Sequence, residues 1–75
     1  MLIIKKQYEQ ESRNGILKKA LVLYRSQYYV ASDNGSETLI FKSDDKGTIK
    51  NFNEVGGACS TSLNEVLSQF SDYMY

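Results

Sequence analysis

The clearest periodicity of the chain lies in "SLNEVLSQFSDYMY", residues 62 to 75. Its apolar side chains recur at intervals of one and three residues, which places them on one side of a 3.6-residue helix. They are Leu63, Val66, Leu67, Phe70, Tyr73 and Met74. The spacing predicts an amphipathic helix that begins after Ser62 and runs nearly to the end of the chain.

A capping box predicts where this helix starts. Ser62 stands three residues before Glu65, so its hydroxyl should accept a hydrogen bond from the Glu65 amide, while the Glu65 carboxylate accepts one from the Ser62 amide. Just upstream, Gly56 and Gly57 permit backbone angles that other residues resist. We expect these glycines to let the chain leave the last strand and turn back across the sheet.

Cys59, the only cysteine, lies between this turn and the helix. A thiol near a helix N-terminus can become a nucleophile, but a catalytic cysteine also needs a base, and the chain has no histidine. The turn could instead bind an anion, yet a phosphate loop of the Walker type needs a lysine, and residues 51 to 75 contain none. We interpret the stretch as a structural start of the helix, and predict no catalytic, cofactor-binding or metal-binding residues and no cofactor.

Upstream of the helix, short β-prone runs alternate with turn signals. The turns are "RNG" at 13 to 15, "DNGS" at 33 to 36 and "DDKG" at 44 to 47. The runs between them are rich in β-branched and aromatic residues and have the length of strands. They cover residues 2 to 8, 16 to 24, 28 to 32, 37 to 42 and 48 to 52.

These elements predict the fold class α+β, as an antiparallel meander sheet of four to five strands with one C-terminal amphipathic helix packed on one face. No composition break marks a linker, so residues 1 to 75 read as a single domain. Residues 16 to 24 also fit one face of a helix. We favour a strand there, because a tight hairpin around Arg25, Ser26 and Gln27 would join it to the next run.

Composition limits the function. A chain of 75 residues with one cysteine and no histidine has neither disulfides nor a Cys/His metal cage to support its small core. Nine basic residues balance nine acidic ones, which argues against nucleic acid as a partner. The start "MLIIKK" is too short an apolar run for a signal peptide or a membrane span. We therefore expect a cytoplasmic protein without a membrane partner.

Three aspartates, Asp33, Asp44 and Asp45, raise the idea of a cation site. The alternating acidic positions and closing glutamate of a Ca²⁺ loop are absent. We interpret all three as turn residues.

Tyrosines concentrate on the central predicted strands. Apolar residues occupy both odd-numbered and even-numbered positions of these strands, so they point to both faces of the sheet. One helix covers only one face of a sheet, so the other face should expose apolar side chains, which mark contacts with a protein partner or a second copy. The partner-binding residues we predict are Tyr24, Tyr28, Tyr29 and Ile40. The three tyrosines together with Phe41, interleaved with Arg25 and Lys42, could alternatively stack single-stranded nucleic acid.

The run "YYVASDNGSETLIFKSDDKGTIKNFNEVGG", residues 28 to 57, together with the helix that follows, resembles small bacteriophage and prophage accessory proteins. In these a hairpin strand of Glu, Thr and apolar residues precedes an acidic glycine turn, a short strand and a Glu-rich helix. The matching residues are Glu37, Thr38, Leu39, Ile40, Phe41, Asp44, Asp45, Gly47, Phe52 and Glu54. That group has a tryptophan where this chain has Phe52.

The resemblance implies a short protein of a mobile element that binds a host protein, a class that includes inhibitors of host defence such as anti-CRISPR proteins. Together with the residues, it predicts a non-catalytic binding protein that acts on a host protein or protein complex in the host cytoplasm. A homodimer is a second candidate assembly. The alternative prediction is a small domain that binds single-stranded nucleic acid through a tyrosine-rich sheet face.

Overall fold

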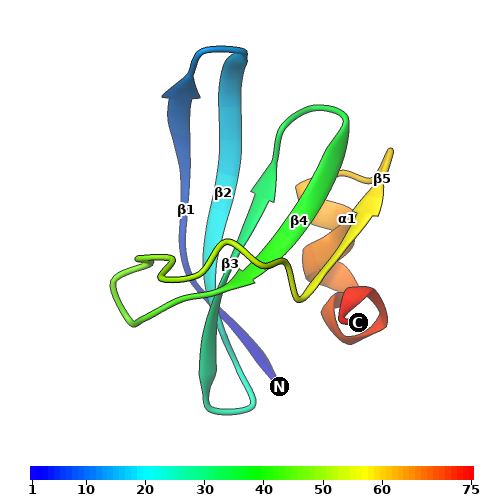
Figure 1. Cartoon of the computed structure of the whole chain (residues 1–75). Helices are drawn as coiled ribbons and strands as arrows, with labels where there is room; N and C mark the ends of the chain where they lie inside the picture. The colour runs from blue at the N-terminus through cyan, green and yellow to red at the C-terminus, as the bar shows by residue number, and fades with distance from the viewer.

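The computed structural model describes residues 1 to 75 and shows a small α+β fold. Five antiparallel strands form one open sheet in the order β1-β2-β3-β4-β5, and a short C-terminal helix packs on it (Figure 1). The strands are β1 (Leu2–Ser12), β2 (Gly15–Tyr24), β3 (Gln27–Asp33), β4 (Glu37–Lys42) and β5 (Gly56–Cys59). The helix α1 (Leu63–Ser68) is followed by the 3-10 helix η1 (Phe70–Tyr73). The predicted meander with a C-terminal helix is thus confirmed.

The first three turns match the sequence signals. Residues 16 to 24 are a strand, as we favoured, and Tyr24 pairs with Gln27 across a two-residue turn. In that turn Arg25 and Ser26 have φ of +50° and +66°, the left-handed angles that suit the twist of a tight hairpin. Between β3 and β4, the Asn34 side chain accepts hydrogen bonds from the amides of Ser36 and Glu37.

The prediction for the fifth strand is wrong. Residues 48 to 52 form no strand, and β5 instead comprises residues 56 to 59, which we had expected to be a turn. Close contact with neighbouring backbone explains why the strand contains these glycines. A Cβ on Gly56 would collide with the backbone oxygen of Tyr73, and one on Gly57 would lie 2.5 Å from the oxygen of Thr38. The glycines serve close backbone approach rather than a reversal of the chain.

The helix is shorter than predicted. It has six residues, and the tail changes to a 3-10 turn and then extends, so that Met74 bridges to Gly56 and the Tyr75 amide donates to the oxygen of Val55 at 3.0 Å. Pairing with the edge of β5 therefore takes precedence over the helical periodicity. No helix is long and apolar enough to cross a membrane.

Half of the predicted capping box is present. The Ser62 hydroxyl accepts from the Glu65 amide at 3.3 Å, but the Glu65 carboxylate makes no hydrogen bond to the Ser62 amide. A residue from the sheet supplies the second cap instead, since the Leu63 amide donates to Asp33 Oδ2 at 3.1 Å.

The core lies between α1 and one face of the sheet. The helix contributes Leu63, Val66 and Leu67, and η1 contributes Phe70. The facing strand residues come from β2, β3 and β4: Ala20, Val22, Tyr29, Ala31 and Ile40. Residues directly opposite each other on paired strands share a face, so Leu21 and Val30, although buried, lie on the other side of the sheet.

Candidate binding surface

The four residues predicted to bind a partner do not form one surface. Ile40 has no exposed area, and Tyr29 is buried with its ring centroid 5.7 Å from that of Phe70. Both are core residues beneath η1, so neither presents a surface to a partner. Tyr24 is half-buried at the margin of the same core, between the Phe70 ring and the Arg25 guanidinium, each 5.2 Å from its centroid.

Tyr28 lies on the opposite side of the sheet. It pairs with Leu23, whereas Tyr29 pairs with Val22 of the core. Because neighbouring residues in a strand point to opposite faces, only Tyr28 of the four belongs to the face away from α1. We call this side the distal face, and its central apolar residues are Leu21, Leu23, Tyr28, Val30, Leu39 and Phe41.

Residues 43 to 55, here called the crossing segment, pass over the distal face between β4 and β5 (Figure 1). Backbone hydrogen bonds fasten both ends, because the Ser43 amide donates to the oxygen of Tyr28 at 3.0 Å and the Val55 amide donates to the oxygen of Ile40 at 2.7 Å. In the middle, Gly47 lies over Leu21 and the Tyr8 hydroxyl. The crossing segment thereby covers part of the distal face, while α1 covers the opposite face of the sheet.

An Asp44 turn shapes the first half of this segment. Asp44 Oδ1 accepts hydrogen bonds from the amides of Lys46 and Thr48, each at 2.9 Å. The bond from Thr48 holds the pKa of Asp44 below its ordinary value, against a smaller opposing effect of desolvation, with further lowering from Lys46 and Lys50. Burial raises the pKa of the Tyr8 hydroxyl beneath the segment. The two amide hydrogen bonds identify Asp44 as a turn residue. No group of three or more His, Cys, Asp or Glu side chains lies close enough together to hold a metal ion.

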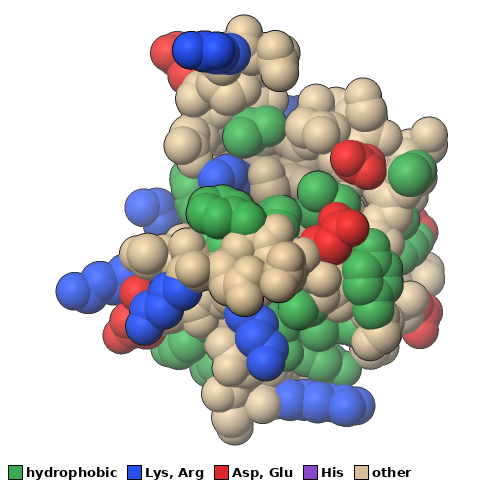
Figure 2. Space-filling view, viewed as in Figure 1, with side chains coloured by type: hydrophobic (Ala, Val, Ile, Leu, Met, Phe, Trp, Pro, Cys, Tyr) green, Lys and Arg blue, Asp and Glu red, His purple; other side chains and the backbone are tan.

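The second half of the crossing segment carries an exposed aromatic side chain. Phe52 is 75% exposed, and its ring stands edge-on to the half-buried Phe41 ring, with centroids 6.0 Å apart. Figure 2 shows hydrophobic side chains on both sides of the backbone that crosses this face. Sequence reasoning included Phe41 among the candidate aromatic residues but missed Phe52 as a binding feature, because it assigned residue 52 to a strand. The one signal for Phe52 was a lone phenylalanine among polar neighbours in "KNFNE".

A hollow beside Phe52 has a different character. It is lined by Gln27, Lys42, Ser43, Asp44, Lys50 and Asn51. The Gln27 side-chain amide donates to the oxygens of Tyr28 and Ser43, which fixes one wall. Lysine side chains next to an exposed aromatic ring are the elements of a single-stranded nucleic-acid site.

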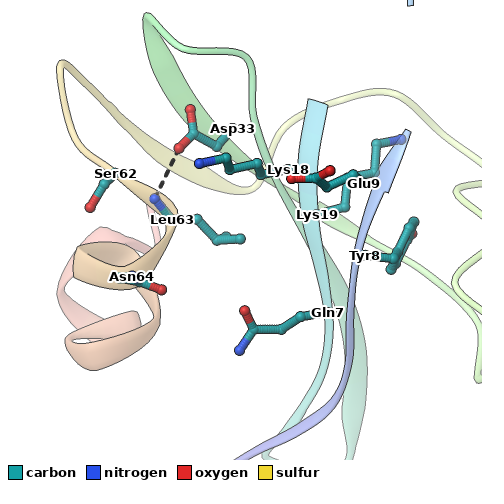
Figure 3. A pocket seen from close by; sticks show the side chains of 9 residues that line it. All are labelled: Gln7, Tyr8, Glu9, Lys18, Lys19, Asp33, Ser62, Leu63 and Asn64. Carbon is teal, nitrogen blue, oxygen red and sulfur yellow. Dashed lines mark hydrogen bonds between the residues drawn. The ribbon is translucent and has the colours of Figure 1, made fainter. Parts of the chain in front are cut away.

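A second hollow lies on the helix side, between the β1–β2 hairpin and the start of α1 (Figure 3). Its lining is mostly polar and charged, with Tyr8 and Leu63 as the two hydrophobic members. The strand register places Glu9, Lys18 and Asp33 side by side across three strands. Asp33 already accepts from the amides of Gly35 and Leu63. Opposite charges on adjacent strands stabilise a sheet, so these residues have a structural explanation.

Cys59 is exposed on β5, and its thiol lies 3.9 Å from Glu37 Oε2. The two residues are paired across β4 and β5, which accounts for their proximity.

Comparison with protein-family models, with curated proteins and with solved structures gave no match to this chain.

Proposed function

We propose that this chain is a non-catalytic binding protein that docks a protein partner on its distal face, around Phe41 and Phe52. The observation that carries the proposal is the 75% exposure of Phe52 on a segment fastened at both ends. A large exposed aromatic ring on a segment anchored at both ends is the type of side chain that is enriched in protein interfaces. Tyr28, Leu23 and Leu39, all half-buried, extend the apolar area around it.

The partner we propose is a host protein or protein complex, and the proposed role is that of a phage-type accessory or inhibitory protein. This step rests on the resemblance of residues 28 to 57 to such proteins. An inhibitor of this kind needs no catalytic group, because it acts by occupying a surface. Attachment of the crossing segment at both ends also favours binding, since less backbone freedom is lost on association than for a free loop.

The experiment uses a matched pair of exposed aromatic residues. The tagged chain and its Phe52→Ala and Tyr75→Ala variants are each used to capture proteins from the host lysate, with quantitative mass spectrometry. Tyr75 is 80% exposed but lies at the end of the chain, beside β5. We expect one partner to be lost with Phe52→Ala and retained with Tyr75→Ala, and its purified form to bind the variant at least about 2 kcal/mol more weakly.

Equal capture by both variants would rule out the distal face as the binding surface. All three chains should have the same melting curve, because neither side chain is buried. A fall in melting temperature with Phe52→Ala would mean that the ring supports the crossing segment. Phe52→Lys would then replace it, because its apolar stem can still pack while its charge would have to be desolvated against an apolar partner.

A second candidate, single-stranded nucleic acid, is favoured by Lys42 and Lys50 in the hollow beside Phe52. Phosphate contacts make affinity fall steeply with salt. Titration of labelled oligonucleotides at two salt concentrations separates the candidates. Tight binding at low salt, abolished together by Phe52→Ala and Lys50→Ala, would replace the protein partner with nucleic acid.

A further inference from the structure

The two edge strands of the sheet differ in length and in what lies beside them. At one edge, β5 has only four residues, and the tail pairs beside its start, through the bridge from Gly56 to Met74 and the hydrogen bond from the Tyr75 amide to the oxygen of Val55. At the other edge, β1 has eleven residues and no strand beyond it (Figure 1). None of the backbone hydrogen bonds outside the helices and strands involves a residue from 2 to 12.

The outer side of β1 is therefore an open row of backbone donors and acceptors. Nine of its eleven residues are exposed, the half-buried ones being Leu2 and Tyr8. Proteins normally protect such an edge by shortening or covering it. Here the protection is limited to a bulge between Ile4 and Lys6 and to the two neighbouring lysines. A long edge left open to this extent is a docking site for another strand.

Charge along β1 identifies the strand that fits it. The basic residues Lys5 and Lys6 lie in its first half, and the acidic residues Glu9 and Glu11 in its second half. Antiparallel pairing of β1 with itself brings the basic half of each copy against the acidic half of the other. In the register that sets Gln7 opposite Gln7, Lys5, the residue at the bulge, lies next to Glu9 of the other copy on both sides of the two-fold axis.

We propose that β1 is a homodimer interface, in which two copies pair antiparallel about Gln7 to form a continuous ten-stranded sheet. The same register sets Lys6 opposite Tyr8, a contact of the kind that Lys6 already makes with the Tyr8 ring of its own chain at 5.2 Å. Because pairing about a two-fold axis uses β1 of both copies, it leaves no further β1 edge open and stops at two copies. The distal face stays free for the partner proposed above, so the two surfaces are independent.

The first test is cross-linking at the two-fold axis, in a Cys59→Ser background that removes the native thiol. Residues directly opposite on neighbouring antiparallel strands have Cα atoms about 4.5 to 5.5 Å apart, which a disulfide can span. Under mild oxidation Gln7→Cys should form a covalent dimer on a non-reducing gel. Glu11→Cys, on the same strand and equally exposed, should not, because its partner in this register is Ile3. Cross-linking of Glu11→Cys alone, or of neither variant, would overturn the proposal.

The second test is sedimentation equilibrium of the intact chain without any cysteine substitution. We expect twice the 8.5 kDa monomer mass at high protein concentration, and roughly tenfold weaker association for Lys5→Glu, which places like charges opposite each other. The control Lys50→Glu changes the same charge on the crossing segment and should leave association unchanged. An equimolar mixture of Lys5→Glu and Glu9→Lys chains should dimerise, since opposite charges then face each other again. A monomer at all concentrations, or equal effects of Lys5→Glu and Lys50→Glu, would refute the β1 interface.

Discussion

Asp33 joins two parts of the molecule that lie thirty residues apart in the sequence. One carboxylate oxygen accepts from the Gly35 amide and so forms the β3–β4 turn, while the other accepts from the Leu63 amide at the start of α1. Turn and helix are thereby positioned by the same side chain. Sequence reasoning identified the turn but not the cap, because a hydrogen bond over that separation leaves no local pattern.

Asp33→Ala should lower the free energy of unfolding by about 1 kcal/mol, as the loss of a helix cap typically does. Asp33→Asn keeps an oxygen for one of the two amides and should lose less. Chemical denaturation of the three chains measures both effects. An Asp33→Ala chain as stable as the wild type would mean that the bond to Leu63 contributes nothing in solution.

The Asp44 turn should stabilise the crossing segment in a pH-dependent manner. The pKa of Asp44 is lowered in the folded chain, so its contribution is complete above the unfolded value of about 3.9 and is lost as the pH falls through the lower folded value. Asp44→Ala should therefore melt at a lower temperature than wild type at pH 7, and the difference should shrink towards pH 2. Asp45→Ala, whose side chain makes no such hydrogen bonds, is the control and should show no pH-dependent difference. A difference that is constant with pH would contradict this interpretation.

At the scale of elements, α1 is held by packing and caps rather than by its length. An isolated helix of six residues is not stable in water, but Leu63, Val66 and Leu67 are all buried against the sheet. The apolar spacing of residues 62 to 75 therefore predicts which side chains pack against the sheet, even where the backbone is no longer helical. Phe70 does so from η1, and Tyr73 and Met74 pack at the margin of the core.

Leu67→Ala should cost about 2 to 5 kcal/mol, because it leaves a cavity beneath α1, and this approaches the whole stability of a small domain. Ser62→Ala, which removes one cap, should cost only about 1 kcal/mol. Thermal unfolding followed by circular dichroism compares the two. A shift of only a few degrees with Leu67→Ala would show that the helix is not packed as described.

At the scale of the whole molecule, the sheet is covered on both sides by different means. The helix covers one face, and the crossing segment covers part of the other, where Leu21 and Val30 are buried. This division assigns the adjacent tyrosines different roles. Tyr29 belongs to the core, and Tyr28 to the distal face.

Tyr29→Ala should therefore destabilise the fold by about 3 to 5 kcal/mol, as the loss of a buried aromatic ring does. Tyr28→Ala should weaken partner capture with a smaller change in melting temperature. Measuring both quantities for both variants separates stability from binding. If Tyr28→Ala leaves capture unchanged, Tyr28 lies outside the interface around Phe52; if it unfolds the chain, its role is structural.

The amino-acid sequence by itself determined the first four strands and the three hairpins that join them, the position of the helix after the sheet, the Ser62 cap and the apolar stripe of the tail. These follow from local physical chemistry: alternation, turn propensities and helical spacing act over a few residues. Tertiary structure alone decided the rest. Residues 48 to 52 cross a face instead of pairing, and Gly56 and Gly57 form the last strand, because only there can the backbones of η1 and β4 approach closely. The burial of Tyr29 rather than Tyr28, and the exposure of Phe52, likewise depend on how distant segments cover the two faces of the sheet. No short stretch of sequence contains that information.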